Sequence, residues 1–246
     1  MRSVIITGVS RGLGAAFFDE FHAAGYRVMA LGRRFSVAQH AAERADPLRV
    51  RLRQADLAYP ASLPSAAEFA SFLSGSTDVV LVHNAGVIDP VGAIGTMAPE
   101  EIERAVSVNV TAPMLLTNAV LAAGLARGGA TDGKPRWRLT VLFISSGAAH
   151  RHIGGWSVYG ATKRAGEAFV EALAAEHADD DRVRVAVVQP GVMDTGMQER
   201  LREYAARDVY FPDRDRYLTL HREGRLADPR EVARRVIAEN IDVVPA

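Results

Sequence analysis

The sequence has no cysteine among its 246 residues. This absence excludes a disulfide scaffold, a thiolate nucleophile and any metal site with sulfur ligands. An excess of either charge is also absent, because 29 Lys and Arg residues balance 29 Asp and Glu residues. A chain without net charge does not attract nucleic acid or an anionic membrane. Scattered histidines such as His150, His152 and His221 are typical of surface or packing positions. We therefore expect no metal, no nucleic-acid partner and no membrane partner.

Long apolar runs are also missing. No segment reaches the run of about 18 apolar residues that a membrane-spanning helix needs. The chain enters an apolar strand at Val4 without the longer apolar stretch of a signal peptide. Hydrophobic residues nevertheless make up 48% of the sequence, which is enough for a large core. The sequence predicts a single soluble domain over residues 1–246, in the reducing environment of the cytoplasm.

Short apolar runs alternate with amphipathic stretches along the chain. The runs are nearly continuous in apolar character, which is typical of strands buried on both faces. Predicted strands cover residues 4–7, 27–31, 48–52, 79–83, 139–144 and 183–188. Predicted helices cover residues 15–24, 63–73, 99–126 and 157–178. This alternation predicts right-handed βαβ units. The expected fold class is therefore a doubly wound α/β domain, in which helices flank a parallel, Rossmann-like sheet.

Two regions interrupt the alternation. Residues 127–138 are polar and contain glycine, which predicts a surface loop between a helix and a strand. Residues 196–225 follow the last predicted strand and mix charged residues with tyrosines and a phenylalanine. Ligands of such sheets bind beyond the carboxyl ends of the strands. We therefore interpret residues 196–225 as a substrate lid; a pair of ordinary surface helices is the alternative.

A glycine-rich turn lies between the first predicted strand and the first predicted helix. Glycines let the backbone approach a pyrophosphate closely, and a helix N-terminus offers N–H groups and a partial positive charge. The turn lacks the Lys-Ser/Thr pair of a nucleoside-triphosphate loop. The predicted phosphate-binding residues are Gly8, Ser10, Arg11, Gly12, Leu13 and Gly14.

The residues after the second predicted strand indicate whether the cofactor is NAD or NADP(H). An NAD site carries an acidic residue about 20 positions beyond its glycine turn, but this sequence has Arg33 and Arg34 there. Together with Arg11, these guanidinium groups suit the 2′-phosphate of NADP(H). The alternative is that one or both arginines are solvated surface residues. Further on, Asp56 and Leu57 follow the third predicted strand, where a carboxylate can accept from the adenine amino group.

The chemistry is indicated by Tyr159 and Lys163. Residues four apart share one face of a helix, and an ammonium beside a phenol lowers the pKa of the phenol. Tyr159 is thereby prepared to exchange a proton with a carbonyl oxygen. Ser146 lies 13 residues earlier, just after the fifth predicted strand. Its hydroxyl can bind the same oxygen and stabilise the charge that develops there.

Taken together, these motifs resemble the short-chain dehydrogenase/reductase family over nearly the whole chain. The resemblance adds Asn84, Ala85 and Gly86 after the fourth predicted strand, Asn109 in the long helix, and residues 190–195 after the sixth strand. The order of the motifs along the chain matches the family's order.

The resemblance implies a role for each site residue. It implies that Tyr159 is the acid/base, that Ser146 anchors the carbonyl, and that Lys163 binds the nicotinamide ribose and lowers the pKa of Tyr159. It also implies that Asn109 holds a water that links Lys163 to solvent. The residues implied in cofactor binding are, on the adenosine side, Asn84, Ala85 and Gly86, and, around the nicotinamide, Tyr159, Lys163, Pro190, Gly191, Val192 and Thr195.

Within the family, three stretches are most similar to the sepiapterin reductase and bacterial benzil reductase branch: residues 155–156, 194–198 and 216–235. This implies NADPH-dependent reduction of vicinal dicarbonyls or of pterin side-chain ketones. Two departures stand out. His83 replaces the first Asn of the family's Asn-Asn-Ala-Gly. The end of the chain lacks the glycine that precedes the pterin-anchoring Asp, so Asp242 is not equated with that anchor, and a seventh strand would be weak.

The residues also bear on other functions. An NAD-linked alcohol dehydrogenase is disfavoured because no acidic residue follows the second predicted strand. A non-catalytic dinucleotide sensor is disfavoured because Ser146, Tyr159, Lys163 and Asn109 are all present. We expect a small carbonyl or alcohol substrate. We also expect a homodimer or homotetramer, because helices 99–126 and 157–178 carry alanine-rich faces through which family members commonly pair.

Overall fold

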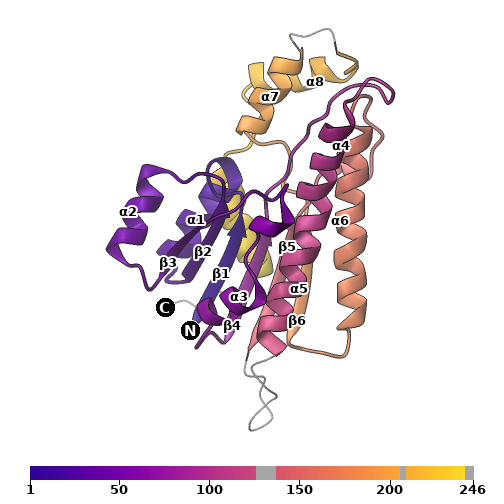
Figure 1. Cartoon of the computed structure of the whole chain (residues 1–246). Coiled ribbons are helices and arrows are strands. Elements are labelled where there is room, and N and C mark those ends of the chain that lie inside the picture. Colours follow the sequence, from indigo (N-terminus) through magenta and orange to yellow (C-terminus); the bar gives the residue numbers. More distant parts are fainter. Residues whose placement is uncertain (126–136, 206–208, 242–246) are drawn as a thin grey trace.

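The structure is a computed structural model, and it describes residues 1–125, 137–205 and 209–241. Within these residues, the strands form one sheet in the order β3-β2-β1-β4-β5-β6, and every neighbouring pair is parallel (Figure 1). The strands are β1 (Arg2–Thr7), β2 (Arg27–Gly32), β3 (Val50–Gln54), β4 (Asp78–His83), β5 (Arg138–Ile144) and β6 (Val183–Val188). The chain direction across the sheet reverses between β1 and β4, which confirms the predicted doubly wound fold and the single domain.

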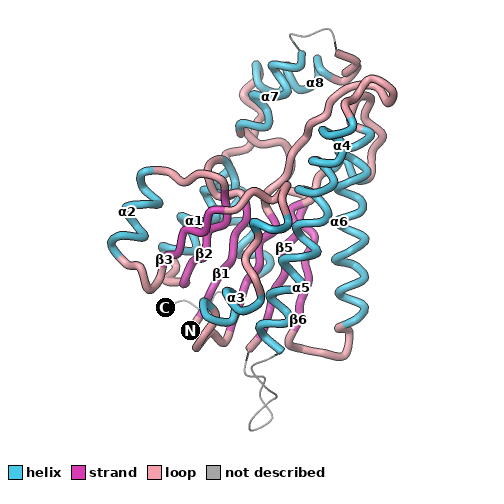
Figure 2. Tube along the Cα trace, viewed as in Figure 1, coloured by secondary structure: helices cyan, strands magenta, loops and turns pink. Residues whose placement is uncertain are grey.

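Helices connect these strands (Figure 2). The α-helices are α1 (Gly12–Ala23), α2 (Val37–Ala45), α3 (Ala66–Phe72), α4 (Pro99–Val106), α5 (Ala112–Leu125), α6 (Ser157–Glu176), α7 (Gly196–Ala205), α8 (Arg214–Arg222) and α9 (Pro229–Asn240). Short turns complete the set: the 3₁₀ turns η1 (Pro60–Ser62) and η3 (Gly147–Ala149), and the π turn η2 (Ser107–Thr111).

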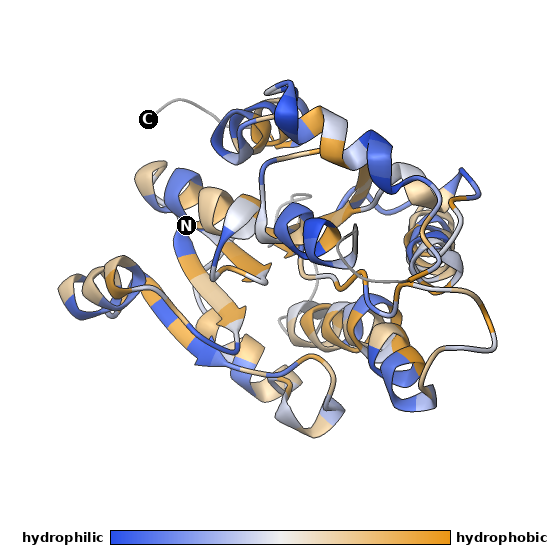
Figure 3. Ribbon diagram, turned by 90° about the horizontal axis from the view of Figure 1, so that it is seen from above, coloured by the Kyte–Doolittle hydropathy of each residue, from blue (hydrophilic) through white to orange (hydrophobic). Residues whose placement is uncertain are grey.

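The sheet separates two apolar cores. α1 and α9 pack against each other on one face, whereas α3, α5 and α6 cover the other. Successive residues of a strand point to opposite faces, so Val4 and Ile6 of β1 belong to the first core and Ile5 belongs to the second. Seen from above, apolar residues predominate in the central strands, and the outer helices carry polar faces (Figure 3).

The third strand begins two residues later than predicted. Before it, the carbonyl of Asp46 accepts hydrogen bonds from the amides of Arg49 (3.1 Å) and Val50 (2.9 Å). Leu48 belongs to this turn, and its side chain is 82% exposed. The apolar residue that suggested the start of a strand therefore lies on the surface.

Helices α2 and α9 were not predicted. α2 begins with a capping box, in which Ser36 Oγ accepts from the amide of Gln39 and Gln39 Oε1 accepts from the amide of Ser36. These two bonds satisfy donors that a helix start leaves unpaired. α2 covers little of the core, so its sequence has no clear apolar stripe to reveal it.

The long helix predicted at residues 99–126 is divided by the π turn η2 into α4 and α5. The segment Pro99–Gly124 is long and apolar enough to cross a membrane by length and composition, a property that the sequence reading did not find. Leu116 and Val120 on its inner side are nevertheless buried in the core with α3. Core helices of soluble proteins have the same character.

Of the predicted surface loop, residues 127–136 lie outside the described residues. At its end, the ring of Trp137 packs on α5, where a Cβ placed on Gly124 would lie 2.0 Å from that ring. Residues 242–246, which include Asp242, also lie outside the described residues.

Residues 196–225 contain α7 and α8, which pack against each other beyond the carboxyl ends of the strands (Figure 1). Phe211 and Tyr217 from this segment form a third apolar cluster with Trp156 and Tyr159 at the start of α6. The segment thus covers the region where Tyr159 lies. Its action as a lid stays a prediction.

Candidate active site

A cleft of about 1090 Å³ runs along the carboxyl edge of the sheet. Its walls come from the glycine turn, from the segments that follow β2, β3, β4, β5 and β6, and from α6 and α7. Every site residue predicted from the sequence lines this cleft except Asn109. Loops far apart in the sequence therefore meet in one place, as parallel strands require.

The glycine turn is packed too tightly for side chains. Gly8 has a φ of +75°, and a Cβ on it would lie 2.9 Å from the backbone of Ala85. A Cβ on Gly14 would lie 2.1 Å from the carbonyl oxygen of Gly8. α1 begins at Gly12, so its N-terminus faces the cleft. This cradle fits a dinucleotide pyrophosphate.

Asn84 locks this turn in place. Its Nδ2 donates to the carbonyl oxygens of Thr7 (3.0 Å) and Gly8 (3.2 Å). In return, Thr7 Oγ1 accepts from the amides of Asn84 and Ala85. Asn84 thus ties the end of β4 to the glycine turn, in addition to lining the cleft.

Arg33 and Arg34 lie at the far end of the cleft, and both are exposed. Among the described residues neither forms an ion pair. Arg11 lies against α7, because a Cβ on Gly196 would be 2.4 Å from its Nη1. The guanidinium groups of Arg33 and Arg34 are thus available to an anion, which fits the phosphate of NADP(H).

Gln39 is a buried residue that the sequence reading missed. Besides closing the capping box of α2, its Nε2 donates to the carbonyl of Val9 at 2.8 Å. It thereby joins the segment that carries Arg33 and Arg34 to the glycine turn. The Ser-x-x-Gln pattern beginning at Ser36 was a signal that could have found it.

Asp56 also has a structural contact. Its Oδ1 accepts from the amide of Ala58 at 3.1 Å and lies 3.9 Å from Nη2 of Arg104. The carboxylate therefore shapes the turn after β3 while it faces the cleft beside Leu57.

Tyr159 is 4% exposed and lies on α6. Burial raises the pKa of Tyr159 to about 12, and a hydrogen bond with Ser146 opposes part of this shift. The phenol therefore keeps its proton at neutral pH. Ser146 is the N-cap of η3, where its Oγ accepts from the amide of Ala148 at 3.2 Å.

Lys163 is also 4% exposed, one helical turn beyond Tyr159. Its Nζ donates to the carbonyl of Ile144 at 2.8 Å and lies 6.0 Å from the centre of the Tyr159 ring. Burial lowers the pKa of Lys163 to about 8. The expected net lowering of the pKa of Tyr159 was wrong for this structure, because burial dominates. The role of Lys163 toward Tyr159 stays a prediction.

Asn109 lies in the π turn, buried beside the cleft. Its Oδ1 accepts from the amide of Val87 (2.9 Å), and its Nδ2 donates to the carbonyl of Val87 (2.9 Å) and to Thr162 Oγ1 (3.0 Å). The side chain therefore braces the segment after β4 against α6. π turns are frequent at functional sites, but the side chain itself does not line the cleft.

Aromatic rings close the end of the cleft near Tyr159. The Trp156 ring lies edge-on to Tyr159, with centroids 5.3 Å apart, and 5.1 Å from Tyr217. Nearby, Asp89 Oδ1 accepts from Arg200 Nε at 3.3 Å, which joins the segment after β4 to α7. The sequence reading missed these partners because no spacing rule pairs residues from different loops.

The sequence model of the short chain dehydrogenase family matches residues 2–206, and the chain belongs to this family. It is therefore an oxidoreductase that acts on carbonyl or alcohol groups. Two curated relatives are named benzil reductase ((S)-benzoin forming). The protein from Bacillus cereus is 29% identical, over 96% of this chain and 92% of its own length. The protein from Bacillus subtilis (strain 168) is 31% identical, over 95% and 90%.

A sepiapterin reductase from Meriones unguiculatus is 29% identical over 95% of this chain and 88% of its own length. The expected branch of the family is thus confirmed. Among solved structures, the KRED1-Pglu enzyme has a TM-score of 0.80 with 27% identity, and it covers all of this chain and 97% of its own. A metagenomic short-chain oxidoreductase in complex with NADP has a TM-score of 0.67 with 25% identity, over 97% of this chain and 90% of its own.

Proposed function

We propose that this protein is an NADPH-dependent reductase that converts a ketone or a vicinal dicarbonyl to the hydroxyl compound. The observation that carries the proposal is the meeting of Ser146, Tyr159 and Lys163 in one wall of the cleft. The two benzil reductases, similar along nearly their whole length, support the choice of a dicarbonyl. The aromatic rings of Trp156 and Tyr217 at this end suit a flat aromatic substrate.

The pKa of Tyr159 supports the reductive direction. Because burial raises it to about 12, the phenol carries the proton that a reduction consumes. Bound NADPH supplies the hydride. Tyr159 gives its proton to the carbonyl oxygen, the Ser146 hydroxyl donates to the same oxygen, and the Lys163 ammonium stabilises the phenolate that is left. We assign the return of a proton to the path beside Asn109.

The remaining cofactor contacts are assigned by position in the cleft. Arg33 and Arg34, with Arg11, would hold the 2′-phosphate. The other assigned contacts are Gly8, Ser10, Gly12, Leu13 and Gly14 at the pyrophosphate, Asp56, Leu57, Asn84, Ala85 and Gly86 at the adenosine, and Pro190, Gly191, Val192 and Thr195 at the nicotinamide. The exposed guanidinium groups support NADP(H) over NAD(H).

The proposal is tested by following NADPH oxidation by the purified protein with benzil, with aliphatic vicinal diketones and with simple ketones. We expect turnover with at least one dicarbonyl, and a lower kcat/KM when NADH replaces NADPH. Absence of NADPH oxidation with every ketone and dicarbonyl, or equal use of NADH, would contradict the proposal. Oxidation of the product alcohols with NAD⁺ in preference would favour the alcohol dehydrogenase instead.

We extend the proposal to assembly and location. Val106, Met114 and Leu115 are exposed apolar residues on the α4–η2–α5 helix, and a twofold partner would cover them. We therefore propose a homodimer or homotetramer. We also propose a location in the cytoplasm, because a protein without cysteine fits a reducing environment. A monomeric mass in solution at micromolar concentration would contradict the assembly.

A further inference from the structure

Glu167 is a buried carboxylate that the proposed mechanism does not use. Its side chain is 1% exposed, on the inner face of α6. It lies one helical turn beyond Lys163 and two turns beyond Tyr159, so the three side chains share one face of the helix. A buried carboxylate is destabilising unless partners pair with it. Its partners therefore indicate what it does.

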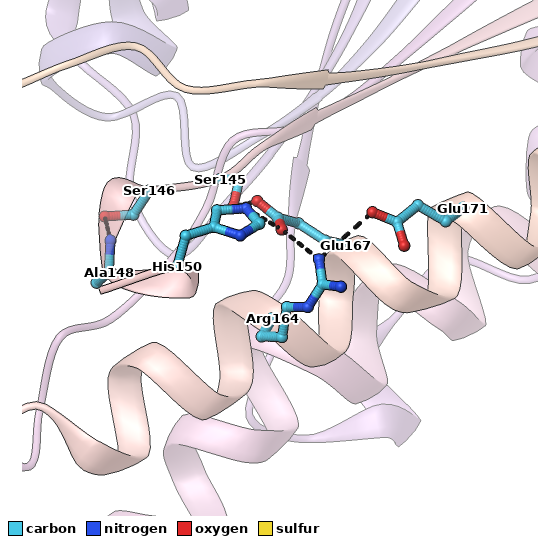
Figure 4. A network of polar contacts seen from close by, with 7 residues as sticks. All are labelled: Ser145, Ser146, Ala148, His150, Arg164, Glu167 and Glu171. Atoms are coloured by element: carbon cyan, nitrogen blue, oxygen red, sulfur yellow. Dashed lines mark hydrogen bonds and ion pairs between the residues drawn. The ribbon is translucent and has the colours of Figure 1, made fainter. Parts of the chain in front are cut away.

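Two partners of Glu167, Ser145 and His150, lie on the segment that carries Ser146, and the third, Arg164, lies on α6 itself (Figure 4). Oε1 accepts a hydrogen bond from Ser145 Oγ. Oε2 lies 2.7 Å from His150 Nε2 and 3.2 Å from Nη1 of Arg164. Ser145 and His150 stand at the two ends of the turn that includes η3. One carboxylate thus holds both ends of the turn.

Ser146 lies between these two anchors. Its Oγ accepts from the amide of Ala148, which fixes the hydroxyl within the turn and leaves its proton to be donated. The position of that hydroxyl relative to Tyr159 depends on how the turn sits against α6. The contacts of Glu167 join the two, in addition to the hydrogen bond between Ser146 and Tyr159 and the bond from Lys163 to the carbonyl of Ile144.

We infer that Glu167 is a positioning residue for the reduction, because it fixes the turn that carries Ser146 against the helix that carries Tyr159 and Lys163. This inference rests on the proposed function. A displacement of about 1 Å at a reacting group can lower a rate about 100-fold, so loss of the clamp acts mainly on kcat.

The charge of Glu167 has a second, measurable effect. It raises the pKa of Lys163, which burial lowers to about 8. The other titratable groups facing Lys163 are Tyr159 on α6 and His83 on β4. Around Glu167 itself the charged or titratable groups are Lys163, His150, Arg164 and Glu171. Removal of the charge should therefore lower the pKa of Lys163 further.

The test compares Glu167→Ala and Glu167→Gln with the control Glu171→Gln. Glu171 is one turn further along α6, shares Arg164, and is 56% exposed. Benzil reduction with NADPH is measured for kcat and KM, with NADPH affinity and thermal unfolding as checks. We expect Glu167→Ala to lower kcat about 10- to 100-fold while NADPH affinity stays close to that of the wild type. Glu171→Gln should match the wild type.

The pH profile separates charge from shape. Gln has nearly the size of Glu and keeps an oxygen that accepts from Ser145. Glu167→Gln should therefore lose less kcat than Glu167→Ala, but the alkaline limb of its profile should move to lower pH. A change in stability alone, with kcat and the alkaline limb unchanged in both variants, would overturn the inference.

A second route covers the case in which Glu167→Ala does not fold. Ser145→Ala removes one arm of the clamp with the loss of a single oxygen. If Ser145 and Glu167 act together, Ser145→Ala/Glu167→Gln lowers kcat by less than the product of the single effects. Full additivity would contradict the clamp.

Tyr159→Phe distinguishes the two levels of the argument. If Tyr159→Phe is inactive but the Glu167 and Ser145 variants keep the kcat of the wild type, only the positioning role is overturned. An active Tyr159→Phe overturns the proposed function itself.

Discussion

The two ends of the cleft are built in opposite ways. Near Tyr159, the reacting groups are buried: Tyr159 and Lys163 are each 4% exposed, and both pKa values are shifted. At the other end, Arg33 and Arg34 are exposed, and the cleft opens to solvent around them. A buried group acts through fixed geometry and an altered pKa, whereas an exposed charge acts through an attraction that water and salt screen.

This difference predicts how each end responds to mutation. Loss of a reacting group at the buried end should alter the rate steeply and cofactor affinity much less. Changes at the exposed end should alter affinity moderately, in a salt-dependent way, and leave the maximal rate nearly unchanged.

The largest effect is expected for Tyr159→Phe. The ring and its contact with Trp156 remain, but the proton donor is lost. Positioned acid catalysis contributes about 10²–10⁴-fold, so kcat for benzil reduction should fall by about that factor. NADPH affinity, measured by fluorescence titration, should stay near that of the wild type. A variant that retains wild-type turnover would remove Tyr159 from the mechanism.

A smaller effect is expected for Arg33→Asp. Hydrogen bonds to charged groups contribute about 1.5–3 kcal/mol, and about 1.4 kcal/mol corresponds to a factor of ten. The wild type should therefore prefer NADPH over NADH by about 10- to 100-fold. In the variant, Asp repels the 2′-phosphate and offers an acceptor to the ribose of NADH. The preference should collapse or invert, while kcat with saturating NADH survives.

Two controls sharpen this measurement. Arg44→Asp makes the same charge change on α2, at an exposed position outside the cleft, and should keep the preference. Added salt should weaken the binding of NADPH more than that of NADH in the wild type. An unchanged cofactor ratio in Arg33→Asp would mean that Arg33 is a solvated surface residue.

The sequence predicts well what depends on local order. The turn from Gly8 to Gly14 and the pair Tyr159 and Lys163 follow from spacing along a single element. Strands β1, β4 and β5 follow from apolar runs, because each is buried on both faces. Helix α2 could not be recognised in this way, because a capping box rather than an apolar stripe defines its start.

The sequence predicts poorly what depends on contacts between elements. Glu167 reads as one more charged residue on a helix until its contacts with Ser145 and His150 are seen. The pKa of Tyr159 was expected to fall because Lys163 is four residues away. Burial, which spacing does not reveal, raises it instead.

His83 lies near Lys163 at the buried end. We expect it to affect the stability of the protein rather than its catalysis. It is 2% exposed at the end of β4, and its Nε2 is 2.8 Å from Thr117 Oγ1. Burial, with the nearby charge of Lys163, lowers the pKa of His83 to about 3 from its ordinary value of 6.5. The folded protein therefore holds this imidazole neutral in weakly acidic solution.

The smallest effect, expected for His83→Gln, is confined to acidic solution. The unfolded chain binds a proton at His83 below about pH 6.5, whereas the folded chain does so only near pH 3. The free energy of unfolding should therefore decrease as the pH is lowered through this window. This residue contributes up to about 1.4 kcal/mol per pH unit to the decrease. Gln does not titrate and can still reach Thr117, so urea unfolding of His83→Gln should depend less on pH, by up to about 2 kcal/mol between about pH 7 and pH 5. His221→Gln, at an exposed position on α8, should follow the wild type. If His83→Gln loses stability in acid in parallel with the wild type, then His83 titrates alike in the folded and the unfolded chain. His83 would then make no contribution to the pH dependence of stability.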